Sequence, residues 1–364
     1  MNILIFFVIL LVLVIVHEFG HFFVAKRFGI RVDEFGFGFP PKLFGIKKGE
    51  TEYTFNALPI GGFVKIFGEN PNEENTNGPD AARSFVNKAR YKQALVLFAG
   101  VFANFLLAWL LFSFSLMSGL PSSAGSEPEG SVLKDVHLVV LSVMPDSPAE
   151  KGGLRSGDKI ISLKSGGDTL TDPNPDTIKS FIVSHGFKEL EVNYLGTDDK
   201  AMIANIIPSK GSDEKPAIGI NMDEIGRAKF SFFRSFYEGM RLNLIITKET
   251  AKGLYTLIIE AVKGNGSLDS VTGPVGLVKV VGDAYQFGFA YLLSFAGLIS
   301  ANLAIINLFP FPALDGGRLL FLLIEKIKGS RMNVRAVNMA NTIGFALLIF
   351  LMLLVTYHDV VRLF

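Results

Sequence analysis

Long apolar runs separated by polar segments dominate the pattern of this chain. The runs cover residues 1–25, 94–117, 289–309 and 341–357. Each is close to the ~20 residues that an α-helix needs to cross a hydrocarbon core ~30 Å thick. The pattern therefore predicts four transmembrane helices, with the longest polar segment between the second and the third.

The first apolar run is also compatible with a secretory signal peptide, because it is N-terminal. Only Met1 and Asn2 come before Ile3, where the uninterrupted apolar stretch begins, so the positively charged start of a signal peptide is missing. No small-x-small cleavage site follows it either. We therefore expect a retained transmembrane helix.

The composition agrees with several membrane spans and a soluble part. The chain has 364 residues, of which 49% are hydrophobic and 19% charged, and its mean hydropathy is +0.39. A net charge of +1 gives no indication of nucleic-acid binding. The absence of cysteine excludes disulfides, thiolate ligands and a cysteine nucleophile.

Basic residues mark the cytoplasmic loops. They cluster in residues 26–31 and 88–92, which flank the first connection, and in residues 318–335, whereas residues 118–132 contain no Lys or Arg. The positive-inside rule then places the 26–93 loop in the cytoplasm. It places both termini and the segment between the second and third spans on the extracytoplasmic side.

Ionisable residues interrupt the first apolar run in the stretch VIVHEFGHFF. His17 and His21 are four residues apart, so on a helix both imidazoles project from one face and can bind one Zn²⁺. Glu18 lies about 100° around the helix and can serve as a general base. Such residues inside a span are functional by default. The alternative is that they cap the end of the span and reach the interface.

A third ligand is available in NLFPFPALDGG, where the third span ends. Pro310 and Pro312 prevent the helix from continuing, and Asp315 precedes two glycines. Asp315 is compatible with a turn or helix-cap residue. It also lies at the cytoplasmic end of its span, on the same side as His17 and His21, and could complete a His₂Asp set.

Four motifs in order along the chain resemble the site-2 protease family of intramembrane zinc metalloproteases, in the branch of the regulator-of-sigma-E protease (RseP). They are HEFGH, GGFVKIFGE, GPVG at residues 273–276 and NLFPFPALDGG. The resemblance implies His17, His21 and Asp315 as ligands of one Zn²⁺ and Glu18 as the catalytic carboxylate. It also implies substrate-handling roles for a polar and proline set: Asn302, Asn307, Pro310 and Pro312.

The same resemblance implies a metalloendopeptidase of the bacterial cytoplasmic (inner) membrane. Its substrates would be single-pass membrane proteins, such as anti-sigma factors or remnant signal peptides, cleaved in or near a transmembrane segment. The lipid bilayer would be its other partner. Two alternatives remain, a non-catalytic membrane PDZ scaffold with a residual metal site and a transporter, but no inverted repeat supports the transporter.

Residues 31–68, within the 26–93 loop, combine aromatic and β-branched residues around a KKGE turn, which predicts a β-hairpin. This hairpin resembles the membrane-associated β-loop of the family. Its later strand includes Gly62, Phe63, Val64 and Lys65 and could pair with an extended substrate by β-augmentation. The alternative is a hairpin that only packs against the helices.

Residues 125–222 contain VVLSVMPDSPAEKGGLRSGDKIISLKSG, which resembles a bacterial PDZ domain. The length allows one such domain, which could capture peptide ends or only restrict access. Residues 229–262 predict an amphipathic membrane-surface helix, although a helix packed under the PDZ domain or a fifth hydrophobic element is also compatible. The predicted fold is a multi-pass α-helical membrane protein with four transmembrane helices, a membrane-associated β-hairpin and one extracytoplasmic α+β PDZ domain.

Overall fold

The computed structural model describes residues 2–125, 131–197, 199–211, 214–264, 273–286 and 288–361. The chain divides into two compact units, which we describe separately. The helical unit comprises residues 1–113, 236–283 and 292–364, and the sheet unit comprises residues 114–235 and 284–291. Part of the predicted PDZ segment, residues 126–130, lies outside the described residues.

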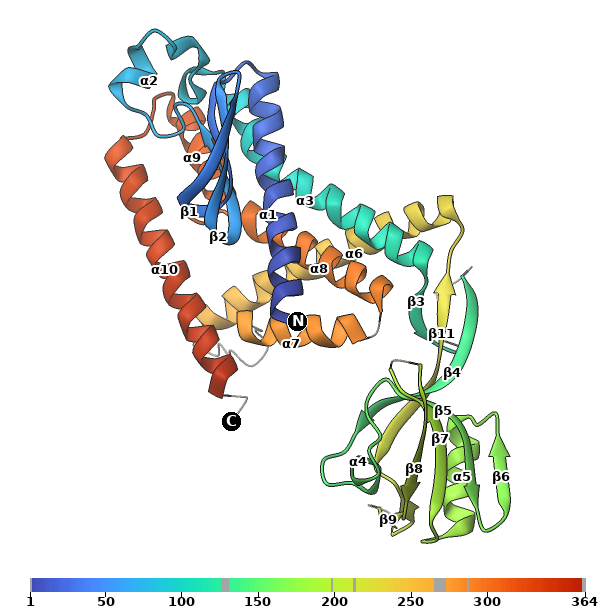
Figure 1. Cartoon of the computed structure of the whole chain (residues 1–364). Coiled ribbons are helices and arrows are strands. Elements are labelled where there is room, and N and C mark those ends of the chain that lie inside the picture. The colour runs from blue at the N-terminus through green and yellow to red at the C-terminus, as the bar shows by residue number, and fades with distance from the viewer. Residues whose placement is uncertain are drawn as a thin grey trace. The chain divides into compact units, whose positions relative to one another are not determined.

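Four described helices are long and apolar enough to cross a membrane, as the hydropathy pattern predicts. They are α1 (Asn2–Arg27), α3 (Arg90–Ser118), α8 (Phe289–Leu308) and α10 (Val334–Val361) (Figure 1). Two helices begin several residues before their apolar runs. α3 begins at Arg90 and α10 at Val334, because good helix formers such as Lys92 and Ala336 stand just before the two runs and no proline separates them from the runs.

A long helix, α6 (Phe232–Val262), packs against two of these helices. Its Leu242 and Ile246 contact a small core formed by Ala108 and Phe112 of α3 and Ala301 of α8. The α6 helix is not among the four candidate spans. Its predicted position on the membrane surface therefore stays a prediction.

The GPVG motif begins a further helix, α7 (Pro274–Gln286). The backbone N–H groups of Gly273 and Gly276 donate to the carboxylate of Asp359, at 3.1 and 2.8 Å. Asp359 is buried near the end of α10. A carboxylate at a helix N-terminus satisfies amides that have no partner within the helix and complements the helix dipole. The motif thus ties α7 to α10.

The predicted hairpin consists of β1 (Val32–Lys48) and β2 (Thr51–Ile66), which pair antiparallel. Both strands bend, so the hairpin folds back on itself. Residues 32–37 pair with residues 62–66 on one side and with residues 52–55 on the other, and the latter also pair with residues 44–47. Among the described strands, the 62–66 segment has one neighbour and forms an edge of this sheet.

A small core fixes the base of the hairpin to the helices. Val32 and Ile66 of the hairpin are buried with Ala25 of α1 and Val96 of α3. Leu319, from α9 (Asp315–Lys328), packs against the same core. Short helical turns follow the hairpin: α2 (Glu73–Asn77), η1 (Ala81–Arg83) and η2 (Phe85–Asn87). This packing places the edge segment of β2 beside α1 (Figure 1).

The sheet unit contains a seven-stranded sheet in the order β3-β11-β4-β5-β7-β8, with β6 beside β5. Its strands are β3 (Leu120–Ser123), β4 (Val132–Val143), β5 (Lys159–Ser165), β6 (Asp168–Thr171), β7 (Leu190–Leu195), β8 (Ala201–Ile206) and β11 (Ile220–Lys229). The remaining elements are α4 (Pro148–Lys151), α5 (Pro175–His185), β9 (Ser209–Lys210) and β10 (Pro216–Ala217).

An apolar core holds the sheet unit together. Leu163, Ile178 and Leu190 are fully buried at its centre, so α5 packs against the sheet. The side chain of Ser147 caps α4 by accepting from Glu150 N at 3.2 Å. Residues 138–165 thus follow a strand–turn–helix–turn–strand order.

Candidate metal centre

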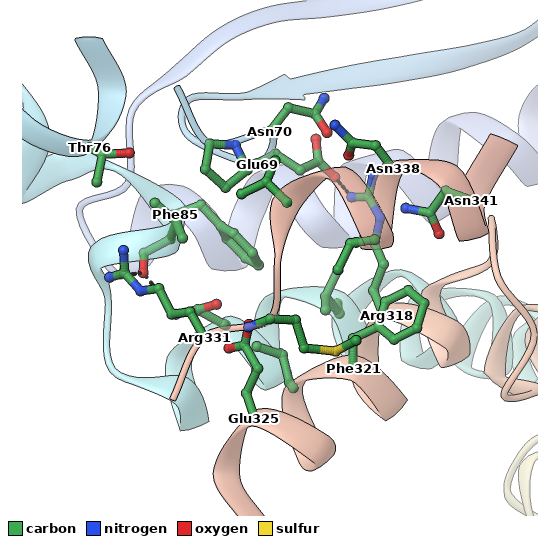
Figure 2. Close-up of a pocket in the computed structure, with 18 residues that line it drawn as sticks. Glu69, Asn70, Thr76, Phe85, Arg318, Phe321, Glu325, Arg331, Asn338 and Asn341 are labelled. Atoms are coloured by element: carbon green, nitrogen blue, oxygen red, sulfur yellow. Dashed lines mark hydrogen bonds and ion pairs between the residues drawn. The ribbon is translucent and has the colours of Figure 1, made fainter. Parts of the chain in front are cut away.

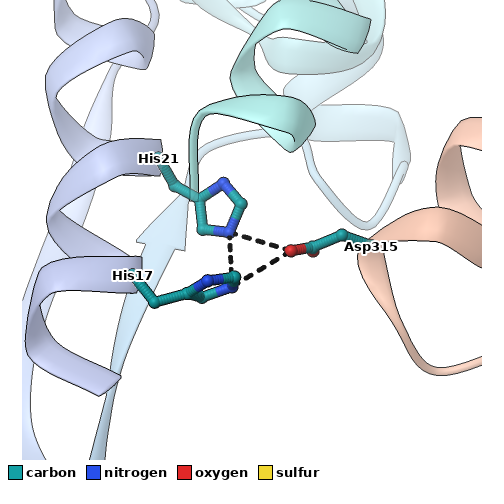
Figure 3. A group of neighbouring side chains, drawn as sticks. All are labelled: His17, His21 and Asp315. Atoms are coloured by element: carbon teal, nitrogen blue, oxygen red, sulfur yellow. Dashed lines mark hydrogen bonds and ion pairs between the residues drawn. The ribbon is translucent and has the colours of Figure 1, made fainter. Parts of the chain in front are cut away.

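Two histidines one helical turn apart occupy the buried face of α1. His17 and His21 are 8% and 6% exposed, and their Nε2 atoms are 3.1 Å apart. Residues four apart on a helix share a face, so this proximity follows from the HExxH spacing. Figure 3 shows both imidazoles directed toward the same point.

The third predicted ligand meets them from α9. Asp315 Oδ2 lies 3.0 Å from His17 Nε2 and 3.2 Å from His21 Nε2 (Figure 3). Leu314 is the N-cap residue of α9, and no side chain caps this helix. The helix-cap alternative is therefore wrong, because the Asp315 carboxylate is directed at the histidines.

A glycine allows α9 to begin at this point. A Cβ atom at Gly316 would lie 2.1 Å from the carbonyl oxygen of Leu308, at the end of α8. No other residue fits such a close approach. The LDGG motif thus brings the start of α9, and with it Asp315, back against the end of the third span.

The three ligand atoms fit a tetrahedral metal ion. Their separations of 3.0, 3.1 and 3.2 Å form a nearly equilateral triangle. Zinc bonds of ~2.0–2.1 Å at tetrahedral angles separate ligand atoms by about 3.3 Å. Asp315 Oδ2 is buried and receives no hydrogen bond from the described residues. Two imidazoles and a carboxylate are a common donor set for zinc, and the triangle leaves a fourth position for water.

Glu18 lies in the same cavity as the three candidate ligands. Its Oε2 accepts a hydrogen bond from the backbone N–H of Val64 at 3.1 Å. The cavity has a volume of about 230 Å³. Its lining combines the metal cluster with the hairpin and α9: His17, Glu18, His21, Phe63, Val64, Ile66, Glu69, Leu97, Ala313, Asp315 and Arg318.

The predicted substrate-handling residues divide into two groups. Phe63 and Val64 line the cavity, whereas the remaining members of that prediction do not: Gly62, Lys65, Asn302, Asn307, Pro310 and Pro312. Asn302 Oδ1 instead accepts from Thr250 Oγ1 of α6 at 2.7 Å. That hydrogen bond ties α8 to α6.

The proline turn before Asp315 is braced by α10. Ala313 lines the cavity and has a φ of +77°, a left-handed conformation that costs energy for a residue with a Cβ. Its N–H donates to Asn341 Oδ1 at 3.1 Å. This contact holds the strained turn, so the fourth span supports the position of Asp315.

Sequence reasoning missed an ion pair at the edge of the cavity. Arg318, one turn after Asp315, pairs with Glu69, which follows β2. Together with Leu97, these residues also line a second pocket of about 270 Å³ between α9, α10 and the loop after β2 (Figure 2). The i, i+3 spacing of Asp315 and Arg318 indicates that they share a helix face and places Arg318 near the cavity, but it does not identify Glu69 as the partner.

Comparisons with known proteins agree with the motifs. The profile of Peptidase family M50 matches residues 5–351. A protein of Clostridium acetobutylicum, provisionally named a zinc metalloprotease, is 36% identical over 351 residues, which are 96% of this chain and 94% of the relative. The regulator of sigma-W protease RasP of Bacillus subtilis is 30% identical over 439 residues, covering 99% of this chain and 98% of the relative.

A solved structure matches part of the chain. It is the PDZ domain of an SdrC-like protein from Listeria innocua, 25% identical, with a TM-score of 0.21; the match covers 24% of this chain and 92% of that domain. The family match, by contrast, extends over almost the whole sequence. The chain therefore belongs to peptidase family M50, the family of intramembrane zinc metalloproteases that its motifs resemble.

Proposed function

We propose that His17, His21 and Asp315 bind one Zn²⁺ and that Glu18 is the general base and acid of peptide-bond hydrolysis. The observation that carries this proposal is the triangle of ligand atoms, all within 3.0–3.2 Å of one another, in one cavity with Glu18. Bound zinc polarises the scissile carbonyl and acidifies water.

Glu18 supplies the proton transfers. It takes a proton from the attacking water and passes it to the leaving amine. The hydrogen bond from Val64 N to Oε2 holds the carboxylate in the cavity and leaves Oε1 to carry the proton. Because α1 supplies both histidines and this base, a single rigid helix sets their mutual geometry.

The substrate binds as an extended strand along the 62–66 edge of the hairpin. A transmembrane helix hides its carbonyl groups in its own hydrogen bonds, so it must unwind before hydrolysis. The edge segment has β1 on one side only, and on its other side Val64 donates to Glu18. Because backbone groups alternate along a strand, Gly62 directs its groups to the same side as Val64, which donates to Glu18. A substrate strand that pairs near Gly62 would therefore run toward the metal cluster.

The protein lies in the bacterial cytoplasmic membrane, with the metal cluster on the cytoplasmic side. The basic loops support this orientation, with both termini and the sheet unit outside. The strand–turn–helix order of residues 138–165 supports the sheet unit as one PDZ domain. Single-pass membrane proteins are the substrate class, and anti-sigma factors are candidates because one relative is named a regulator of sigma-W protease.

The test compares purified wild-type protein with Glu18→Gln, which changes one carboxylate to an isosteric amide. We expect both to hold one zinc ion per chain and only the wild type to cleave a model transmembrane substrate. A loss of about 10²–10⁴-fold is typical when a general acid–base residue is removed. If both proteins bind zinc and neither cleaves any of several substrates, the non-catalytic scaffold is the correct assignment.

A further inference from the structure

One face of α3 runs along the two candidate zinc-binding histidines. Val96, Gly100 and Asn104 are spaced by four residues, so they lie on the same face of this helix. The carbonyl oxygen of Val96 contacts His21 and the side chain of Asn104 contacts His17, so α1 and α3 run antiparallel here. Both contacts involve the Nδ1 atom, the ring nitrogen opposite the one that faces Asp315.

Gly100 makes this close approach possible. A Cβ atom at Gly100 would lie 2.4 Å from His21 Nε2 and 2.8 Å from His17 Cε1. Any other residue would therefore push α3 away from the candidate metal cluster. The contacts one turn on either side of Gly100 depend on this glycine.

The backbone fixes the tautomer of His21. Its Nδ1 lies 2.8 Å from the carbonyl oxygen of Val96, which can only accept a hydrogen bond. Nδ1 therefore carries the proton, and Nε2 keeps the lone pair that a metal ion requires. No substitution of the Val96 side chain removes this contact.

At His17, the side chain of Asn104 takes the place that the Val96 carbonyl group takes at His21. Asn104 is 1% exposed, and its Nδ2 lies 3.5 Å from His17 Nδ1. Asn104 Oδ1 is buried without a hydrogen-bond partner among the described residues. The Asn104 backbone is held in place, because its carbonyl oxygen accepts from Ser300 Oγ at 2.8 Å.

A half turn of the Asn104 amide gives its oxygen a hydrogen-bond partner, and the NH2 group takes the position that the oxygen held. The oxygen and nitrogen of an amide exchange places on rotation about the Cβ–Cγ bond. Oδ1 then occupies the position beside His17 Nδ1 and accepts a hydrogen bond from Nδ1–H. The buried oxygen gains a partner, and His17 Nε2 is left with its lone pair toward Asp315.

We infer that Asn104 is a positioning residue that holds His17 in its metal-binding tautomer through an Nδ1–H···Oδ1 hydrogen bond. The inference rests on the proposed zinc site. The two histidines are thus held differently: a backbone carbonyl orients His21, and one buried amide orients His17. Loss of an outer partner of this kind typically costs 10–100-fold in metal affinity.

The test measures zinc affinity of the full-length protein in detergent by competition with a chelator. Asn104→Leu, which cannot accept a hydrogen bond, is expected to bind zinc 10–100-fold more weakly. Asn104→Asp keeps an acceptor at the same position and is expected to bind at least as tightly as wild type. If the leucine variant does not fold, as judged by its melting temperature without metal, Asn104→Ala takes its place.

Asn243→Leu is the matched control. Asn243 is 0% exposed on α6, its Nδ2 donates to the carbonyl oxygen of Phe105, and its Oδ1 also lacks a partner among the described residues. This variant is expected to melt earlier but to bind zinc as wild type does. Wild-type affinity in Asn104→Leu, or an equal loss in Asn243→Leu, would overturn the inference.

Zinc binding and cleavage separate this inference from the proposed function. If the wild type cleaves nothing but zinc affinity depends on Asn104 as expected, the positioning role stands and the protease assignment fails. If the wild type cleaves and Asn104→Leu binds zinc unchanged, only the positioning role fails. The absorption spectrum of the Co²⁺-loaded protein gives an independent readout, which should change in Asn104→Leu and be restored in Asn104→Asp.

Discussion

The helical unit and the sheet unit differ in how many of their large apolar side chains are exposed. In the sheet unit, large apolar side chains such as Leu163, Ile178 and Leu190 are fully buried. In the helical unit, many large apolar side chains of α1 and α10, including Phe19 and Phe345, are exposed. Lipid is as apolar as these side chains, so exposing them to a membrane costs almost no free energy. The unusual feature of the helical unit is therefore its buried polar residues.

Buried polar groups serve different purposes in the two units. In the sheet unit, Asp158 accepts from Arg155 N at 2.8 Å and Ser165 donates to the carbonyl oxygen of Glu189, so both satisfy nearby backbone. In the helical unit, His17 and His21 turn toward Asp315. We therefore expect substitutions of the buried polar groups around His17 and His21 to change metal binding, and substitutions of buried polar groups in the sheet unit to change only stability.

The largest expected effect is loss of the metal. Asp315→Ala removes the one carboxylate of the proposed ligand triangle, so zinc content and cleavage should both fall to background. Removal of zinc from the wild type by a chelator should abolish cleavage by at least the 10²–10⁴-fold expected for the catalytic base, and added zinc should restore it. Elemental analysis and a peptide-cleavage assay measure these changes.

The sheet unit supplies the control for this variant. Hydrogen exchange of the β5 and β7 amides should be the same in Asp315→Ala as in wild type, because the substitution lies in the other unit. An Asp315→Ala protein that retains full zinc occupancy would show that the third ligand is another residue.

The next effect lies in the apolar core of the sheet unit. Leu163→Ala leaves a cavity at a fully buried position of β5, and such changes cost about 2–5 kcal/mol of unfolding free energy. Hydrogen exchange of the full chain should report faster opening of β5 and β7. Zinc content should not change, and a loss of zinc would mean that the two units are coupled more strongly than the comparison implies.

A smaller effect is expected where the GPVG motif meets α10. Asp359→Leu leaves the amides of Gly273 and Gly276 without their acceptor, which costs about 1–3 kcal/mol for a buried group. Asp359→Asn keeps one acceptor oxygen and should lose less. Thermal unfolding in detergent measures the difference. Equal melting temperatures for both variants and wild type would contradict the role assigned to this carboxylate.

The number of candidate spans could be predicted because length and hydropathy are sufficient to identify a span. The start of α10 could not, because Arg335 and Asn338 lower the hydropathy of a segment that is nevertheless helical. The hairpin could be located from its composition. Its fold-back, which makes residues 62–66 an edge, depends on pairings that composition does not specify.

The candidate site could be predicted only in part from the sequence. The spacing of His17 and His21 indicates a shared face, but Asp315 required the family resemblance because an Asp before two glycines is common at turns. Asn104 and Arg318 were missed. Within an apolar run a single Asn looks like part of the span, and only the packing of α1 against α3 shows what faces it.

The smallest effect concerns the buried aspartate of the sheet unit. Burial raises the pKa of Asp158, and the hydrogen bond from Arg155 N opposes this shift without cancelling it. The folded protein therefore binds a proton at pH values where the unfolded chain has lost it. The contribution of Asp158 to stability is fully present below the ordinary pKa of an aspartate and is lost as the pH rises through the raised value.

Asp158→Asn tests this contribution because it keeps an acceptor for Arg155 N but cannot titrate. We expect the variant to be more stable than wild type at neutral pH, by less than the ~1 kcal/mol of one hydrogen bond, and equal to it at acidic pH. Hydrogen exchange of the β5 and β7 amides between pH 4 and pH 7 measures the difference. A constant gap across this range would mean that packing, and not charge, accounts for it. A gap that closes at acidic pH would make the contrast with Asp315 sharp, because removing the charge stabilises the sheet unit at one buried aspartate and removes the metal site at the other.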